Sequence, residues 1–185
     1  MGQSLASSNM KQLLLICAVV MGQSVLAAKP LTKEESAKKI ETAIRKELKK
    51  PTGKLTKADL VKVTELHLNY NNLTDVKGLE KLTQLESLYL YYNQLTDVKG
   101  LEKLTKLKWL NLTKNRLTNV KSLEKCTQLT FLRLESNQLT DLTGLEKLSQ
   151  LTYLDLRNNS DLTKSQIAEL QKALPKCKFF SNPYK

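Results

Sequence analysis

A repeat of 22 residues constrains the fold of this chain more than any other feature of its sequence. Leucines recur at this spacing from Leu66 to Leu154, and asparagines recur in the same way from Asn71 to Asn159. One copy, residues 85–106, reads LESLYLYYNQLTDVKGLEKLTK. Five copies follow the pattern L-x-x-L-x-L-x-x-N-x-L, apart from a valine at residue 63 and a leucine that comes late at residue 162. Because one copy cannot bury its own leucines, the period predicts stacked units that share one core.

The type of residue found at each position of the repeat has a physical explanation. Leu88 and Leu90 alternate with polar and aromatic residues, which is the periodicity of a strand with one buried face. The Asn93 amide can bond to backbone groups where the chain leaves the strand, so that stacked asparagines would form a ladder. A tight bend is expected at a loop position that three of the copies fill with glycine and one with serine: Gly78, Gly100, Ser122 and Gly144.

The segment before the repeats carries helix signals. Thr32 and Glu35 form a capping-box pattern, and apolar residues follow at helical spacing as far as Leu48, before Pro51 ends the helix. Residues 56–59 contain a second possible box. The sequence therefore predicts a helical cap over the first repeat, which would keep the core of that repeat from solvent.

The 22-residue repeats, with their convex segment LTDVKGLEKLTQL, resemble internalin-like bacterial leucine-rich-repeat proteins over about residues 63–159. The resemblance implies an α/β leucine-rich-repeat solenoid, a right-handed horseshoe with a parallel sheet on its concave face and short 3₁₀-like turns on its convex face. It also implies protein recognition. We expect helical caps at both ends, because a helix (residues 163–174) and a short strand (residues 177–179) are predicted after the repeats.

The first 28 residues are predicted to be a signal peptide. Lys11 precedes an apolar run from Leu13 to Met21, and Val25 and Ala27 suit a cleavage site. The apolar run is shorter than the roughly 20 residues of a spanning helix. Secretion or a periplasmic or cell-envelope location is therefore expected, without a transmembrane span after cleavage. A retained anchor and a true start at residue 10 are the alternatives.

The predicted organisation is thus a signal peptide (1–28), an N-terminal helical cap (29–62), about five leucine-rich repeats (63–159) and a C-terminal helical cap with a final strand (160–185). Cys126 stands at a repeat position that the other copies fill with leucine, and Cys177 lies near the far end of the predicted stack. With about 4.8 Å per rung, the two lie beyond the roughly 7 Å limit for a disulfide. We expect two free, buried thiols.

The sequence lacks the residues that an enzyme site needs. His67 is the only histidine, which argues against a metal centre with several histidine ligands, and the cysteines do not form a zinc pattern. No GxxxxGK loop and no GxSxG elbow is present. We therefore predict no catalytic residues, no metal site, no cofactor and no enzymatic activity.

The net charge of +12 is unevenly distributed, because residues 29–62 carry 11 basic and 5 acidic side chains. The predicted concave face is balanced, with Lys108, Lys114, Arg133 and Arg157 against Glu65, Glu86, Glu135 and Asp155. A nucleic-acid groove would not be neutral, so no nucleic-acid partner is expected. Contact of the basic cap with acidic envelope polymers or lipid head groups remains open.

Alternation in the strands places seven of the ten aromatic side chains on the concave face. Aromatic residues and arginine often dominate binding interfaces. The predicted partner-binding residues are Trp109, Phe131, Tyr153, Tyr89, Tyr91, Tyr92, Arg133 and Tyr70. The other interpretation is that the rings stack only to stabilise the sheet.

Two functions follow from this surface. The first is a non-catalytic module that recognises a protein partner through its concave face. The alternative is a module that binds carbohydrate or a cell-envelope polymer, with the concave aromatics as sugar platforms and the basic cap for acidic groups. The same aromatic residues serve both functions.

Overall fold

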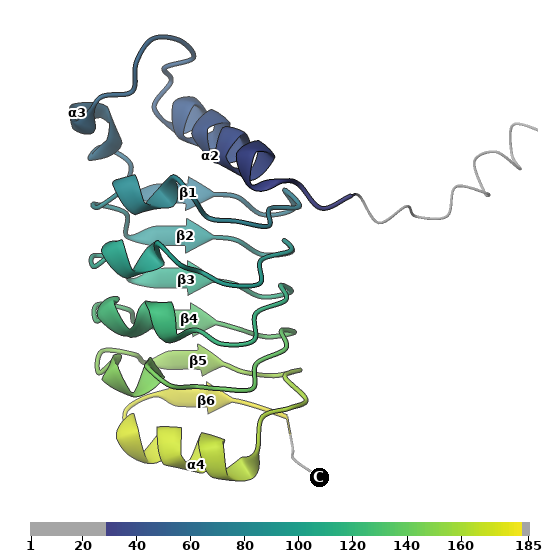
Figure 1. The fold of residues 1–185 in the computed structure, drawn as a ribbon. Coiled ribbons are helices and arrows are strands. Elements are labelled where there is room, and N and C mark those ends of the chain that lie inside the picture. The colour runs from purple at the N-terminus through teal and green to yellow at the C-terminus, as the bar shows by residue number, and fades with distance from the viewer. Residues whose placement is uncertain (1–28, 183–185) are drawn as a thin grey trace, which may run out of the picture.

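The computed structural model describes residues 29–182, which form a stack of rungs with a helix over each end (Figure 1). Each rung contributes one short strand to a single parallel sheet, in the order of the sequence. The strands are β1 (Glu65–His67), β2 (Ser87–Tyr89), β3 (Trp109–Asn111), β4 (Phe131–Arg133), β5 (Tyr153–Asp155) and β6 (Lys178–Phe180). From β1 to β5 neighbouring strands pair with a shift of one repeat, so that Leu88 lies beside Leu110. The predicted parallel-sheet solenoid is confirmed.

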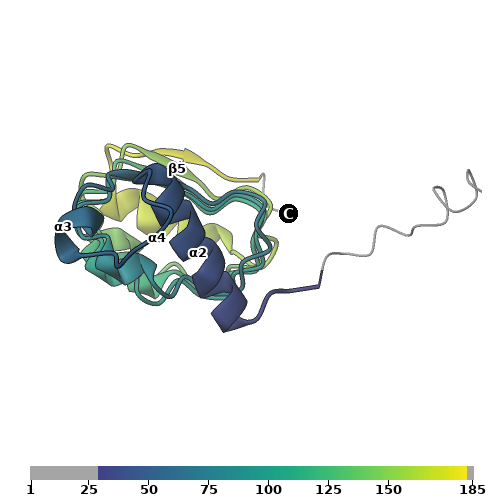
Figure 2. The same ribbon diagram turned by 90° about the horizontal axis from the view of Figure 1, so that it is seen from above.

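Short 3₁₀-helices form the opposite side of the stack: η1 (Leu79–Lys81), η2 (Leu101–Lys103), η3 (Lys121–Lys125) and η4 (Leu145–Lys147). Figure 2, seen along the stack, shows the sheet on one side and these helices on the other. The leucine columns fill the space between the two sides. Leu88, Leu110 and Leu132 have no exposed surface, which confirms their predicted place in the core.

The asparagines form the predicted ladder. The Asn115 amide donates to the carbonyl oxygens of Leu90 and Leu112, both at 3.0 Å, and its oxygen accepts from the backbone N–H of Leu95 at 3.1 Å. Asn93, Asn137 and Asn159 repeat this pattern in their own rungs. Each of these side chains therefore forms hydrogen bonds with buried backbone groups of two adjacent rungs. A buried backbone group without a hydrogen bond would lower the stability of the protein.

A glycine precedes three of the four 3₁₀-helices, at the point where the chain bends. Gly78, Gly100 and Gly144 have φ angles of 107°, 104° and 97°, which are difficult for residues with a Cβ atom. The glutamate two residues later accepts a hydrogen bond from each of these glycine N–H groups, as Glu102 does from Gly100 at 2.6 Å. This role of Glu80, Glu102 and Glu146 was not predicted from the sequence.

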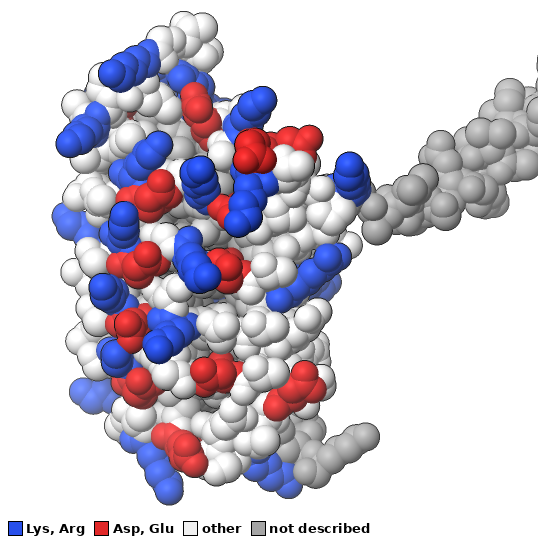
Figure 3. Space-filling view, in the orientation of Figure 1, with Lys and Arg blue, Asp and Glu red and all other residues white. Residues whose placement is uncertain are grey.

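The rung with Ser122 differs, and the bend expected there is absent. Its 3₁₀-helix begins earlier, at Lys121, with Val120 as the preceding residue at φ −136°. Because this rung has no glycine at the bend, Glu124 accepts no hydrogen bond from a glycine N–H. It instead forms an ion pair with Lys147 of the next rung at 2.5 Å. Figure 3 shows this face, where basic and acidic side chains lie side by side.

Helices cover both ends of the stack. Helix α2 (Lys33–Glu47) begins at the predicted capping box of Thr32 and Glu35, and Ile40 and Ile44 bury against the first rung. It ends at Glu47, four residues before Pro51, and Lys49 then adopts a left-handed conformation. A second capping box begins the short α3 (Lys57–Leu60). At the other end α4 (Lys164–Ala173) packs its apolar side, residues 167, 170 and 174, onto the last rung.

The two described cysteines are free, as expected, but only one of them is buried. Cys126 has no exposed surface, and burial raises the pKa of its thiol to about 12. Cys177 is half-buried, because it precedes the edge strand β6, and so the prediction of two buried thiols was wrong. The predicted signal peptide lies outside the described residues. Within residues 29–182, no helix has the length and apolar character needed to cross a bilayer.

Candidate functional site

The outer surface of the sheet, here called the sheet face, carries a continuous stack of aromatic rings. Trp109 and Phe131 lie parallel with ring centroids 3.6 Å apart, and Phe131 and Tyr153 follow at 4.2 Å. The three residues pair with one another across β3, β4 and β5, so the alternation of the strands places them as predicted. The Arg133 guanidinium lies 5.2 Å from the Phe131 centroid and 5.7 Å from that of Tyr153.

The stack continues onto a residue that the sequence pattern did not indicate. Phe180 lies 4.9 Å from Tyr153, with the Arg157 guanidinium over its ring. The final strand was predicted to end at residue 179, one residue too early. Since Phe179 packs against the core, alternation along a strand longer by one residue would have placed Phe180 on the sheet face.

Asp155 does not contribute an exposed charge, contrary to the balance of charges expected for the sheet face. It is fully buried, and the Arg157 guanidinium forms two hydrogen bonds with its carboxylate at 2.9 and 2.7 Å. This ion pair lies where β6 covers the last repeat, with Phe180 as the strand partner of Asp155. Arg157 is therefore held in place by Asp155, and one of the cations expected to balance the sheet face is paired with a buried carboxylate.

The remaining predicted tyrosines form a second cluster near the N-terminal end of the sheet. Tyr70, Tyr91 and Tyr92 lie with ring centroids between 5.0 and 6.0 Å apart, and the Lys114 amine is 5.5 Å from the Tyr91 centroid. Tyr89 belongs to neither group, because its ring stacks on His67 at 4.4 Å. The predicted site residues are thus divided between an aromatic stack (Trp109, Phe131, Tyr153 and Phe180) and a tyrosine cluster (Tyr70, Tyr91 and Tyr92).

Backbone conformation explains the tyrosine cluster. Tyr70 and Tyr92 have φ angles of 59° and 55°, and the equivalent residues of the next three rungs (Lys114, Ser136 and Asn158) have angles of 55°, 56° and 57°. Left-handed backbone is uncommon for bulky side chains and costs roughly 1–2 kcal/mol. The repeated rung geometry imposes it, and it brings Tyr70 and Tyr92 beside Tyr91. Tyr70 is 65% exposed and Tyr92 is 51% exposed.

Comparison with known proteins identifies the repeat. A family model for leucine-rich repeats in two copies matches residues 61–103, 105–147 and 127–172, which together cover more than half of the chain. The chain belongs to the leucine-rich-repeat family. No curated protein matches the sequence.

The leucine-rich-repeat solenoid is similar to solved internalins. The internalin InlF of Listeria monocytogenes matches with a TM-score of 0.73 at 26% identity, over 85% of this chain and 45% of InlF. Internalin C2 of the same species matches with a TM-score of 0.72 at 29% identity, over 80% of this chain and 65% of that protein. A leucine-rich-repeat protein of Leptospira interrogans has a TM-score of 0.61 at 30% identity, over 68% and 33%.

These likenesses confirm an internalin-like solenoid, although this chain spans less than two thirds of each of those proteins. The extended concave surfaces of repeat solenoids are the parts that usually bind other molecules. Among residues 29–182, no group of three or more His, Cys, Asp or Glu side chains could hold a metal ion.

Ion pairs neutralise much of the charge on the sheet face of this leucine-rich-repeat protein. Lys108 pairs with Glu86 at 2.9 Å, and Arg157 pairs with Asp155 at 2.7 Å. Within the described residues, Arg133 and Lys114 form no ion pair and lie instead over aromatic rings. Lys178 likewise lies 4.9 Å from the Phe180 centroid and forms no ion pair with a described residue, so three cations without a carboxylate partner lie next to the aromatic residues of the sheet face.

The tyrosine cluster also shifts acid–base equilibria. A hydrogen bond from the Tyr70 hydroxyl, and then one from Lys114, lower the pKa of Tyr91 from its ordinary value. The same contacts raise the pKa of Tyr70 and of Lys114. Lys114 therefore stays charged at neutral pH, and the three groups form one hydrogen-bonded unit rather than separate surface side chains.

Proposed function

We propose that this leucine-rich-repeat protein is an exported, non-catalytic binding module that recognises a protein partner through its sheet face. Trp109, Phe131 and Tyr153 form the centre of the proposed site, with Arg133 beside them. The tyrosine cluster with Lys114 is a second contact region. The apolar run and cleavage pattern of residues 1–28 support export.

The aromatic stack with Arg133 across it carries the proposal. Aromatic and arginine side chains supply most of the hot-spot energy in protein interfaces. Here neighbouring rungs hold the rings, since each ring lies against the next with interplanar angles of 3° and 10°. Side chains that are already ordered lose little conformational freedom on binding, and this preorganisation favours affinity.

The direction in which the rings lie favours a protein over a glycan. Phe131 has Trp109 on one side and Tyr153 on the other, so neighbouring rings cover both of its faces. A sugar ring would need an open aromatic face, whereas the stack turns ring edges outward. Of the three central rings, Trp109, at 36% exposure and beside the small Ser87, is the one whose second face no aromatic side chain of the described residues covers. A sugar would therefore have this single platform at the centre of the site, which the glycan array tests. Apolar edges next to a guanidinium suit the mixed chemistry of a protein surface.

The test is a comparison of variants in partner capture. The immobilised protein is used to capture partners from an envelope extract, and the affinity of each captured protein is then measured for the wild type and for the double variant Trp109→Ala/Phe131→Ala. We expect a loss of at least about 2 kcal/mol of binding free energy, the scale of an interface hot spot. Lys103→Ala on the convex side serves as the control.

A glycan array run with the same three proteins separates the two functions. Binding of a glycan that depends on Trp109, with no protein whose capture depends on it, would favour the carbohydrate function. If the double variant binds every captured protein at wild-type strength, the stack only stabilises the sheet and the proposed function is wrong.

A further inference from the structure

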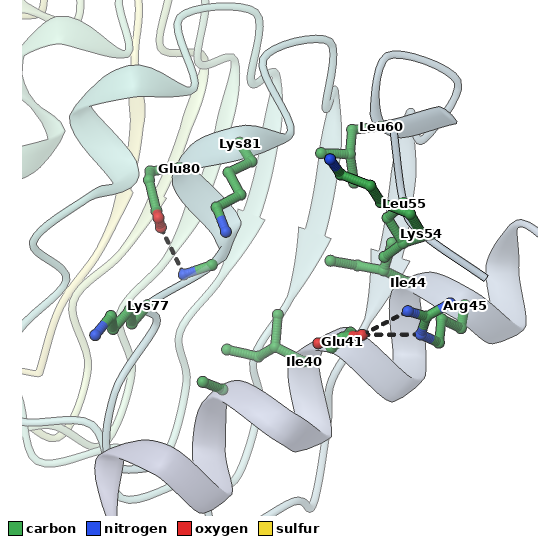
Figure 4. A pocket seen from close by; sticks show the side chains of 12 residues that line it. Ile40, Glu41, Ile44, Arg45, Lys54, Leu55, Leu60, Lys77, Glu80 and Lys81 are labelled. Atoms are coloured by element: carbon green, nitrogen blue, oxygen red, sulfur yellow. Dashed lines mark hydrogen bonds and ion pairs between the residues drawn. The ribbon is translucent and has the colours of Figure 1, made fainter. Parts of the chain in front are cut away.

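A cavity of about 400 Å³ lies between helix α2, the loop before α3 and the 3₁₀-helix η1, away from the sheet face (Figure 4). Its apolar lining comes from Ile40 and Ile44 of α2 and from Leu55 and Leu60 on the opposite wall. The volume falls within the range of small-molecule sites, about 300–1,000 Å³. The cap therefore contains a concave surface with both aliphatic and charged lining residues, which lies apart from the proposed site on the sheet face.

Polar contacts hold the walls of this cavity in place. The Arg45 guanidinium donates to the carbonyl oxygens of Lys50 and Gly53, at 3.4 and 3.0 Å, and so fixes the loop against α2. Lys50 in turn pairs with Asp59 at 2.7 Å, and Asp59 also caps α3. The cavity is thus formed by tied segments and does not depend on a loose loop.

The charges at the rim are not balanced. Glu41 pairs with Arg45 at 2.7 Å, and Glu80 accepts the Gly78 N–H at 2.5 Å, so both carboxylates are already engaged. Lys54 and Lys81 line the same cavity and form no ion pair with any described residue. Figure 4 shows Lys81 extending from η1 toward α2. The rim therefore offers free ammonium groups above an aliphatic floor.

We propose that this cavity binds a small amphipathic anion, an aliphatic chain that ends in a carboxylate. The chain would lie against the half-buried Ala37, Leu55 and Leu60, directly above the buried Ile40 and Ile44. The carboxylate would pair with Lys54 and Lys81. An acidic polymer without apolar groups would leave the aliphatic floor uncovered. The site is independent of the proposed sheet-face function, because no residue of the aromatic stack or of the tyrosine cluster lines it.

The proposal is tested with octanoate as the probe, by titration of the full protein followed by NMR of the isoleucine methyl groups. Saturable shifts at Ile40 and Ile44 are expected. Acetate, which lacks the chain, should bind at least about tenfold more weakly, and octanol, which lacks the charge, should bind at least about threefold more weakly. Equal affinity for octanol, or no saturable shift with octanoate, would overturn the proposal.

Two variants locate the site. Lys54→Glu/Lys81→Glu should weaken octanoate binding about tenfold or more, whereas Lys103→Glu, the same repeat position one rung further on, should leave it unchanged. Ala37→Phe would place a ring in the cavity and should abolish binding, with thermal unfolding used to check that the cap is intact. An equal loss in Lys103→Glu, or full binding by a folded Ala37→Phe protein, would contradict the assignment.

Discussion

The interior and the sheet face of this protein are built by the same strands but follow different rules. The inward side chain at the centre of each of the first five strands is always leucine, from Leu66 to Leu154. The outward side chain just before it changes from one rung to the next: Glu65, Ser87, Trp109, Phe131 and Tyr153.

The physical reason lies in what each side contacts. An inward leucine packs into neighbouring rungs at full density, so its size and shape are fixed by the stack. An outward side chain contacts water and a few neighbours on the sheet face, and its replacement leaves the leucine core almost unchanged. The comparison therefore separates residues that specify the fold from residues that are available for recognition.

The largest effect is expected for the leucine columns. Leu110→Ala removes a side chain with no exposed surface and should cost about 2–5 kcal/mol of unfolding free energy. Lys103→Ala on the convex side should be nearly neutral. Urea unfolding of both variants provides the measurement, and comparable losses would show that Leu110 does not carry the core.

The asparagine ladder should come next. Asn115→Ala removes one of the two hydrogen bonds that the carbonyl oxygens of Leu90 and Leu112 each accept and leaves the buried N–H of Leu95 without its partner, and should cost about 1–3 kcal/mol. Asn71→Ala should cost less than about 1 kcal/mol, because Asn71 is only half-buried and its amide donates to Asn69 within its own rung. Equal losses would mean that bonding between rungs is unimportant.

A smaller effect is expected at the glycine bends. Gly144→Ala puts a Cβ atom 3.3 Å from the Lys121 carbonyl oxygen at a φ angle of 97°, and should cost about 1–2 kcal/mol. Ser122→Ala, at the equivalent position of a rung that does not bend in this way, should change stability little. Thermal unfolding of the two variants tests the difference, which would vanish if both rungs made the same turn.

The repeats and the capped helices at the two ends could be predicted from the sequence, whereas the contacts made by the final strand could not. Strand register, the asparagine ladder and the burial of Cys126 follow from five aligned copies, each of which supports the others. Burial of Asp155 and the position of Phe180 depend on β6, which is not part of the repeat. The half-exposed Cys177 has the same origin.

The site residues illustrate the same limit. The alternation of side chains along each strand predicted a single column for Trp109, Phe131 and Tyr153, because strand geometry alone fixes it. It could not separate Tyr70 and Tyr92 into a second cluster, since that depends on a left-handed backbone for which a tyrosine carries no signal. The different turn at Ser122 could have been suspected, because serine does not share glycine's preference for positive φ.

The most direct test of the comparison uses two adjacent residues of β3 that point to opposite sides. Trp109→Ala removes one stacked neighbour of Phe131 and should cost no more than about 1 kcal/mol of unfolding free energy, the range of a single cross-strand pair. We predict that equilibrium urea unfolding will show a loss several times smaller than that of Leu110→Ala. If Trp109→Ala destabilises the protein as much as Leu110→Ala, the aromatic stack is part of the fold, and the separation between interior and sheet face fails.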